Sequence, residues 1–172
     1  MKRIIVIGSG GAGKSTFSKR LGDVSGIEVI HLDQIYWRPN WVKTGKDEWR
    51  RIVEGLIAKN SWIMDGNFGG TREMRLAACD TVIFLDIPRR ICLYRILKRS
   101  IIYRGKTRPD MAEGCKERFD LEFLVWVWNY PKTSGKRALE EMSQLDGKRI
   151  IVLRNTNDIE EFLKNPYAKK ER

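Results

Sequence analysis

The stretch Gly8–Thr16, GSGGAGKST, decides the fold of this chain because it joins an apolar run to a helical one. It fits the pattern G-x-x-x-x-G-K-[ST], with its fixed positions at Gly8, Gly13, Lys14 and Ser15. Glycines let the backbone curl until its N–H groups point at one anion, and the following helix start adds positive potential. The lysine reaches the β and γ phosphates of a nucleotide, and the next hydroxyl binds Mg²⁺. We therefore expect a nucleoside triphosphate site, with ATP as the nucleotide, at Gly8, Gly10, Gly11, Ala12, Gly13, Lys14, Ser15 and Thr16.

The segments around this loop predict an α/β fold. RIIVIG, residues 3–8, is uniformly apolar, as in a strand buried in a parallel sheet, and residues 14–22 have helical spacing. The rest of the chain alternates in the same way. Further strands are expected at 27–31, 61–65, 80–86 and 148–154, and helices at 46–58, 88–103, about 115–130, 135–145 and 157–165. This order predicts a three-layer P-loop fold: a five-stranded parallel sheet with helices on both faces.

Length and composition restrict the class of protein. A chain of 172 residues with 42% hydrophobic residues suggests a single domain, 1–172. Its net charge of +11 favours anionic partners, such as phosphorylated small molecules or nucleic acid. Three widely spaced cysteines match no disulfide framework and no zinc site, so we expect a cytoplasmic protein. The apolar start is too short for a signal peptide, and no segment is long enough to span a membrane.

Carboxylates follow three of the predicted strands, at Asp33, Asp65 and Asp86. Ligands of open parallel sheets bind at the carboxyl ends of the strands, and a carboxylate beside a phosphate loop commonly holds Mg²⁺ or its water. We expect Ser15 and Asp65 to be the metal-binding residues. The alternative for Asp65 is a turn cap before Gly66. Asp86 precedes a proline at a helix start, which favours a structural capping role.

A basic segment follows the fourth strand. Residues 89–108 contain eight basic residues and no acidic one. Transfer of a phosphoryl group requires positive charge on oxygens that gain charge in the transition state. We interpret about 99–115 as a short arginine-rich lid, with Arg99, Arg104 and Arg108 on the phosphates. The alternatives are a solvated helix face and a nucleic-acid patch.

Two further features have structural interpretations. His31, the single histidine of the chain, precedes the end of a strand and is expected to be a core or hydrogen-bonded residue rather than a catalyst. Trp126 and Trp128 are two positions apart, so a helix cannot bury both on one narrow stripe. We expect one of them to face the lid or a partner chain.

With these motifs assembled, the chain resembles the adenylate kinase and shikimate kinase branch of the P-loop fold. The resemblance rests on GSGGAGKS, on WIMDGN and on DIPRRICLYR. HLDQIYWRPNW, DGNFGGT and the run from FLDIPR to RPDMAEGCKERFD look closer still to the bacterial DNA topology modulation proteins, which are adenylate-kinase-like. This similarity spans nearly the whole chain and implies an ATP site of the kinase type.

The resemblance also implies roles for single residues. Arg95 occupies the position of the arginine that follows the D-x-P motif, and it is expected to act on the phosphates. Asp33 resembles the acid that orients or deprotonates an acceptor hydroxyl in the shikimate kinase pattern. Asn155 and Thr156 lie where the branch holds adenine. The segment between the second and third strands is short, so AMP as the acceptor is in doubt.

The residues around Asp33 suggest an acceptor-binding arm at 34–60. Trp37 and Trp41 would wall a pocket for a flat acceptor, or would instead pack the arm against the body. Glycines after the third strand would let the backbone approach the acceptor, and nearby arginines would bind its anionic group, although Arg75 could equally lie on an outer helix face. The expected acceptor-binding residues are Asp33, Trp37, Arg38, Gly66, Asn67, Gly69, Gly70 and Arg75.

Two functions from different classes follow from these features. The first is an ATP-dependent kinase that uses Mg²⁺ and phosphorylates a small acceptor, a nucleotide or nucleoside among the candidates. The second is an ATP-dependent nucleic-acid-binding protein that modulates DNA topology, which the net charge of +11 supports. No N-K-x-D segment for guanine is present, which argues against a signalling GTPase. Either function is compatible with a monomer or a homodimer.

Overall fold

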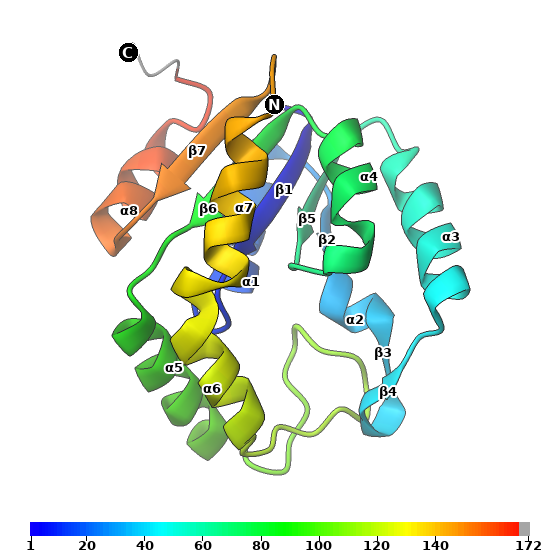
Figure 1. The fold of residues 1–172 in the computed structure, drawn as a ribbon, viewed down its shortest axis with the longest axis vertical. Coiled ribbons are helices and arrows are strands. Elements are labelled where there is room, and N and C mark those ends of the chain that lie inside the picture. Colours follow the sequence, from blue (N-terminus) through cyan, green and yellow to red (C-terminus); the bar gives the residue numbers. More distant parts are fainter. Residues whose placement is uncertain (169–172) are drawn as a thin grey trace.

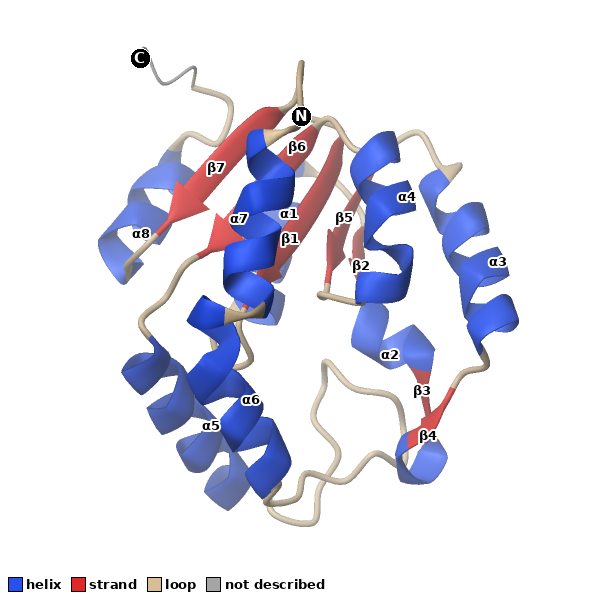
Figure 2. Ribbon diagram, viewed as in Figure 1, coloured by secondary structure: helices blue, strands red, loops and turns tan. Residues whose placement is uncertain are grey.

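The computed structural model describes residues 1–168 and has a five-stranded parallel sheet in the order β2-β5-β1-β6-β7 (Figures 1 and 2). All five predicted strands are confirmed. Their bounds are β1 (Arg3–Gly8), β2 (Val29–His31), β5 (Trp62–Asp65), β6 (Thr81–Leu85) and β7 (Arg149–Leu153). The strand that leads into the phosphate loop lies at the centre of the sheet, because β1 pairs with β5 on one side and β6 on the other.

Alternate residues of β1 enter two different hydrophobic cores, as the uniformly apolar sequence of this strand requires. Ile5 and Ile7 face one core, and Ile4 and Val6 face the other; each is at most 1% exposed. A strand covered on both sides has no polar face, since successive side chains point to opposite faces of the sheet. The apolar side chains on both faces of β1 therefore require a layer of helices on each side of the sheet.

Helices cover both faces of the sheet. One core takes side chains from α3 (Lys46–Ile57), α4 (Arg72–Ala78) and α7 (Ser134–Ser143), and the other takes them from α1 (Lys14–Ser25), α5 (Arg89–Ile102) and α8 (Thr156–Lys164). Figure 1 shows α4 and α7 in front of the sheet and α1 behind it. No helix within residues 1–168 is both long and apolar enough to cross a membrane.

Two helix boundaries, one additional helix and one helix cap differ from the sequence-based expectation. The helix expected at about 115–130 is α6 (Leu121–Asn129), because the Asp120 side chain accepts from the Phe123 N–H and caps it there. A short helix, α2 (Leu32–Tyr36), follows β2 directly and was not predicted. The final helix starts earlier than predicted, since Asn155 caps it by accepting from the Asp158 N–H. Asp86 does not cap α5, whose N-cap is Pro88 without a side-chain hydrogen bond.

The arm at 34–60 and the lid meet at the carboxyl ends of the strands (Figure 1). The arm contains the rest of α2, the short strands β3 (Trp37–Arg38) and β4 (Val42–Lys43), a 3-10 turn (Pro39–Trp41) between them, and α3. The lid is the loop at 103–120 between α5 and α6. The two are joined by Gln34 Nε2 to Pro109 O at 2.6 Å, Trp41 Nε1 to Lys116 O at 3.0 Å, and Cys115 Sγ to Arg38 O at 3.2 Å. The lid is therefore closed over the arm in this structure.

Candidate active site

The phosphate loop has a backbone that its glycines make possible. Gly11 and Gly13 have φ values of +73° and +93°, which L-residues with side chains rarely adopt. A Cβ on Gly11 would also lie 2.4 Å from the carbonyl oxygen of Cys92 in α5. Lys14 follows at the first residue of α1, and its Nζ donates to the Ser9 carbonyl at 3.0 Å. The curled loop and the helix start thus form an anion site.

Two side chains hold this loop from outside. Asn67 accepts from the Gly8 N–H at 3.2 Å and donates to the Gly8 carbonyl at 2.9 Å. Arg95, on α5, donates through Nη1 to the Ala12 carbonyl at 3.1 Å. Asn67, which was expected to bind the acceptor, and Arg95, which was expected to act on the phosphates, both make hydrogen bonds to the backbone of the phosphate loop.

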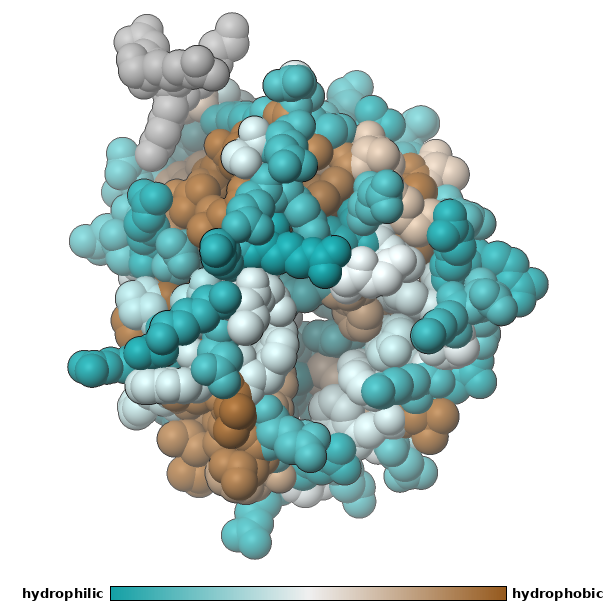
Figure 3. Space-filling model, in the orientation of Figure 1, coloured by the Kyte–Doolittle hydropathy of each residue, from teal (hydrophilic) through white to brown (hydrophobic). Residues whose placement is uncertain are grey.

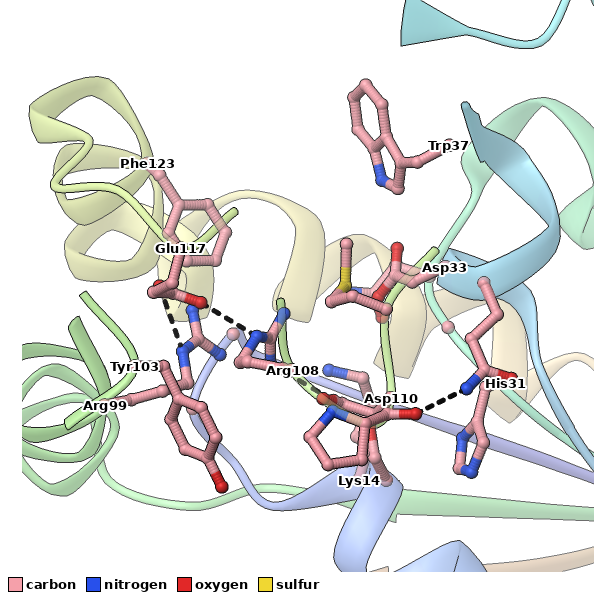
Figure 4. A pocket seen from close by; sticks show the side chains of 18 of the residues that line it. Lys14, His31, Asp33, Trp37, Arg99, Tyr103, Arg108, Asp110, Glu117 and Phe123 are labelled. Carbon is pink, nitrogen blue, oxygen red and sulfur yellow. Dashed lines mark hydrogen bonds and ion pairs between the residues drawn. The ribbon is translucent and has the colours of Figure 1, made fainter. Parts of the chain in front are cut away.

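A cavity of about 1190 Å³ opens in front of the loop, enclosed by the arm, the turn after β5, the lid and α6. Figure 3 shows the surface hollowed between these parts, and Figure 4 shows the side chains inside. Thirteen of the predicted site residues line it: Gly10, Gly11, Gly13, Lys14, Ser15, Thr16, Asp33, Trp37, Gly66, Asn67, Arg95, Arg99 and Arg108.

Asp33 lies in the same cavity as the phosphate loop. It is the second residue of α2, and the short helix directs it inward from the end of β2 (Figure 4). Burial raises the pKa of the Asp33 carboxyl, and the nearby charges of Asp65 and Asp110 act in the same direction. Lys14 and Arg108 oppose this increase. A carboxylate with a raised pKa in front of a phosphate loop is suited to accept a proton from a hydroxyl.

Two carboxylates, Asp65 and Asp33, act on the charge of Lys14. Burial lowers its pKa, while Asp65 and Asp33 favour the charged ammonium. The Ser15 hydroxyl lines the cavity beside it. One hydroxyl with one or two neighbouring carboxylates is the oxygen donor set that Mg²⁺ takes when it also binds phosphates and water, so these residues fit the ion.

Asp65 has a partner that the sequence did not identify. It is 3% exposed, and its Oδ2 lies 2.9 Å from His31 Nδ1. The hydrogen bond to Asp65 raises the pKa of His31. The expectation that His31 is hydrogen-bonded is met, and the predicted metal-binding role of Asp65 stays a prediction. Because β2 and β5 pair with His31 beside Asp65, the contact follows from the register of the sheet.

A buried carboxylate organises the lid arginines. Glu117 has a side chain that is 5% exposed, and it lies between Arg99, at 3.3 Å, and Arg108, at 2.8 Å (Figure 4). Arg108 also contacts Asp110 at 3.1 Å. The pKa of Arg99 is lowered, first by burial and then by the charge of Arg108. Sequence analysis missed Glu117, because a single acid near the end of a basic loop matches no motif and has no distinctive spacing.

Arg75 corrects one prediction. It was expected to bind the acceptor, but it is 0% exposed and lies outside the cavity lining. Its guanidinium donates to the carbonyls of Gly66, Asn67 and Phe68, at 3.0, 2.8 and 3.0 Å, and to that of Thr71 at 3.3 Å. Burial lowers the pKa of Arg75 to about 10. Arg75 therefore fixes the turn after β5, and three of its four acceptors belong to residues that line the cavity.

Other predicted residues also lie outside the cavity lining. Arg38 points away and pairs with Glu48 at 2.5 Å, and Arg104 is exposed on the lid. The Asn155 side chain is used as the helix cap described above, so it is not an adenine contact here. The remaining predicted residues outside the lining are Gly8, Ala12, Asp65, Gly69 and Gly70, the last two exposed.

Aromatic side chains line the cavity from both the arm and α6. Trp37 and Trp41 meet edge-on at 5.4 Å, and Phe123 stacks on Trp126 at 5.7 Å. Trp37 and Phe123 enter from opposite sides in Figure 4. Phe123 and Trp126 were not predicted as site residues, although the two-residue spacing of Trp126 and Trp128 indicated that only one could be buried.

Trp128 lies on the other side of α6. It is 42% exposed, and the Arg89 guanidinium lies 3.8 Å from its ring centroid. Exposed Leu97 and Val125 lie beside it, so α5 and α6 share an exposed apolar surface here. The expectation that one of the two tryptophans faces the lid is met by Trp126, since it lines the cavity that the lid covers.

Comparisons with known proteins give matches only at the level of structure. No protein-family model matches the chain, and no curated protein matches it in sequence. A shikimate kinase from Acinetobacter baumannii, solved with shikimate, is similar with a TM-score of 0.64 and 16% identity, over 96% of this chain and 90% of that one. A shikimate kinase from Bacteroides thetaiotaomicron has a TM-score of 0.60 and 14% identity, over 96% of both chains.

A third solved structure is that of a sugar kinase from Janibacter, with a TM-score of 0.51 and 17% identity, over 96% of this chain and 92% of that one. These similarities and the parallel sheet define the class: a three-layer α/β protein with the fold of the P-loop kinases. At 14–17% sequence identity, structural similarity establishes the fold and does not identify the acceptor.

Proposed function

We propose that the protein is an ATP-dependent phosphotransferase that moves the γ-phosphoryl group of ATP to a hydroxyl of a small acceptor. The observation that supports this most is that a phosphate loop with its lysine, Lys14, and a half-buried carboxylate, Asp33, line one cavity. A nucleotide-binding switch needs the first of these features. The second feature, a carboxylate that a short helix places in front of the loop, is what transfer to the hydroxyl of a second molecule requires.

ATP would be bound by the phosphate loop. Backbone N–H groups of Gly11, Gly13, Lys14 and Ser15 and the Lys14 ammonium would face the phosphates. Arg95 stands beside the loop, at the Ala12 carbonyl. Arg99 and Arg108 line the same cavity from the lid, so guanidinium charge is available for the oxygens of the transferred group.

The transfer would need one base. The acceptor hydroxyl oxygen forms a bond to the γ phosphorus, the bond from that phosphorus to the bridging oxygen breaks, and ADP leaves with the electron pair. The hydroxyl proton passes to the Asp33 carboxylate, whose raised pKa favours proton acceptance over that of an exposed acid. Ser15, with Asp65 or Asp33, would hold Mg²⁺, which when bound neutralises charge on the phosphate oxygens.

The test is acceptor-dependent formation of ADP. Purified protein receives Mg·ATP with a panel of nucleosides, nucleoside monophosphates and small hydroxy acids, and ADP release is followed with a coupled assay. Lys14→Ala and Asp33→Asn should both abolish the acceptor-dependent rate, and only Lys14→Ala should weaken ATP binding. Arg50→Ala, an exposed surface change on α3, is the control and should leave the rate unchanged. ATP binding without any acceptor-dependent ADP would contradict the proposal.

The second function, ATP-dependent binding of nucleic acid in the manner implied by the resemblance to DNA topology modulation proteins, has the net charge of +11 as its support. The lid presents less positive charge to a nucleic acid than its sequence suggested, because Arg99 and Arg108 face inward and both contact Glu117. DNA binding that is lost steeply with salt and depends on ATP would favour this function.

A further inference from the structure

We infer that the acceptor is an uncharged molecule with a flat ring and a free hydroxyl, a nucleoside rather than a nucleotide or a hydroxy acid. This inference rests on the phosphotransferase function proposed above and concerns the half of the cavity that faces Asp33. It follows from three properties of that half: its arginines are already bound elsewhere, a carboxylate, Asp33, faces the ligand, and its walls are aromatic.

The arginines that sequence analysis offered for an anionic acceptor are not free to bind one. Arg38 lies outside the cavity lining with its guanidinium on Glu48. Arg75 is fully buried and donates to four backbone carbonyls. Recognition of a phosphate or carboxylate ordinarily uses a bidentate arginine with free donors. Neither arginine of this part of the chain meets that requirement.

The remaining cations lie at the phosphates or at the rim. Arg95 binds the phosphate loop, and Arg99 and Arg108 face Glu117 on the lid. Arg118 has a side chain that is 65% exposed and lies 4.0 Å from Asp120, and Lys43 is exposed on β4. An exposed side chain at the edge of a cavity gains little from an ion pair, because water competes for the charge.

Two carboxylates, Asp33 and Asp110, line the acceptor half. Asp110 is paired with Arg108 at 3.1 Å, and Arg108 also contacts Glu117 at 2.8 Å, so these lid charges satisfy one another. Asp33 is therefore the carboxylate that a ligand would meet in this half. The two neutral amide side chains nearby already donate to backbone carbonyls: Gln34 donates to Pro109 and Asn67 donates to Gly8. A phosphate or carboxylate placed here would meet like charge with few donors to offset it.

The walls of this half favour a flat ring. Trp37, Trp41 and Phe68 contribute from the arm and the turn after β5. Phe123, on α6, lies at the other end of the cavity, because its ring packs against Gly10 of the phosphate loop. Aromatic side chains bind bases by stacking, which requires no charge on the ligand. Trp37 and Asp33 are four residues apart and both line the cavity, so a base stacked on the Trp37 ring would place its sugar hydroxyls on the side of the carboxylate (Figure 4).

The test measures acceptor binding separately from turnover. With the ATP site filled by a non-hydrolysable Mg·ATP analogue, tryptophan fluorescence is titrated with adenosine, guanosine, cytidine and thymidine, with their 5′-monophosphates, and with shikimate as the hydroxy acid. We expect at least one nucleoside to bind at least tenfold more tightly than its own monophosphate and than shikimate. Trp37→Phe should weaken that binding or remove most of its signal, whereas Trp128→Phe, on the far side of α6, should leave the affinity unchanged.

Turnover with Mg·ATP is then measured for the same compounds. Tighter binding or faster phosphorylation of a monophosphate or of shikimate would overturn the inference and leave the phosphotransferase function standing. Binding of no nucleoside would also overturn it. Tight nucleoside binding with no ADP formed would instead overturn the phosphotransferase function and support the acceptor class.

Discussion

Replacing Arg75 by methionine distinguishes the role that the sequence suggested from the one that the structure assigns. Methionine keeps an unbranched apolar stem in the buried site and removes the guanidinium. If Arg75 fixes the turn after β5, the variant loses stability. If Arg75 binds the acceptor, the variant loses acceptor affinity at unchanged stability. The two outcomes are measured independently.

The expected loss can be estimated from the four hydrogen bonds to Gly66, Asn67, Phe68 and Thr71. Removal of one partner of a buried charged group costs roughly 3–5 kcal/mol. Burial lowers the pKa of Arg75 to about 10, so desolvation already offsets part of what the four hydrogen bonds contribute. The expected loss is therefore at the lower end of this range, about 3 kcal/mol.

The assay is urea and thermal unfolding of the wild-type protein, Arg75→Met and Arg75→Lys. A loss of about 3 kcal/mol corresponds to a Tm lower by about 6–12 °C in a protein of this size. Arg75→Lys should lose a similar amount, since one ammonium cannot span four carbonyls. Arg72→Met, on the same helix, removes a bidentate ion pair with Glu141, at 2.6 and 2.8 Å. It should cost about 1–2 kcal/mol, because Glu141 keeps Arg137 at 3.0 Å.

The reasoning is refuted if Arg75→Met unfolds within about 2 °C of the wild-type protein. It is equally refuted if the variant is stable and its KM for the acceptor rises while its KM for ATP does not. In either case the guanidinium would be serving the ligand rather than the turn.

Three further predictions concern titration and the lid. The acidic limb of the pH profile of kcat/KM should lie above the ordinary carboxyl range, because burial raises the pKa of Asp33; Asp33→Asn should lower kcat by about 10²–10⁴-fold and remove that limb, and a limb that persists would exclude Asp33 as the base. His31 gives a single imidazole signal in NMR, and it should titrate above 6.5 and fall in Asp65→Asn, so the pair's contribution to stability is full below pH 6.5 and is lost as pH rises through the raised pKa; titration at or below 6.5 would contradict the pair. Glu117→Gln should lower the free energy of unfolding by about 3 kcal/mol, since it leaves buried cations such as Arg108 with less opposite charge. Mg·ATP should then raise the Tm of this variant more than that of the wild-type protein, and equal increases would show that phosphates do not reach these arginines.

The strands and the phosphate loop were predictable because their signals are local. An apolar run of five or six residues in a chain of this kind is a buried strand, and the loop pattern specifies backbone conformations that glycine permits at Gly11 and Gly13. The lid boundary was less predictable. The chain between Cys115 and Asp120 has helical composition but forms a loop, because Asp120 caps the helix that follows it and contacts with the arm hold the preceding residues.

The sequence by itself therefore determined the three-layer α/β fold, the phosphate loop at its centre and the presence of an acid, Asp33, near it, since each depends on neighbouring residues alone. Only the tertiary structure decided which charged side chains are available to a ligand. Arg75 and Arg38 look equivalent to Arg95 in the sequence, yet one is buried on carbonyls and one is paired outside the cavity. A side chain's partners come from segments far away in the chain, and burial and pairing decide the energy of a charge. The same reason explains Glu117, whose importance appears only where the lid folds back on α5.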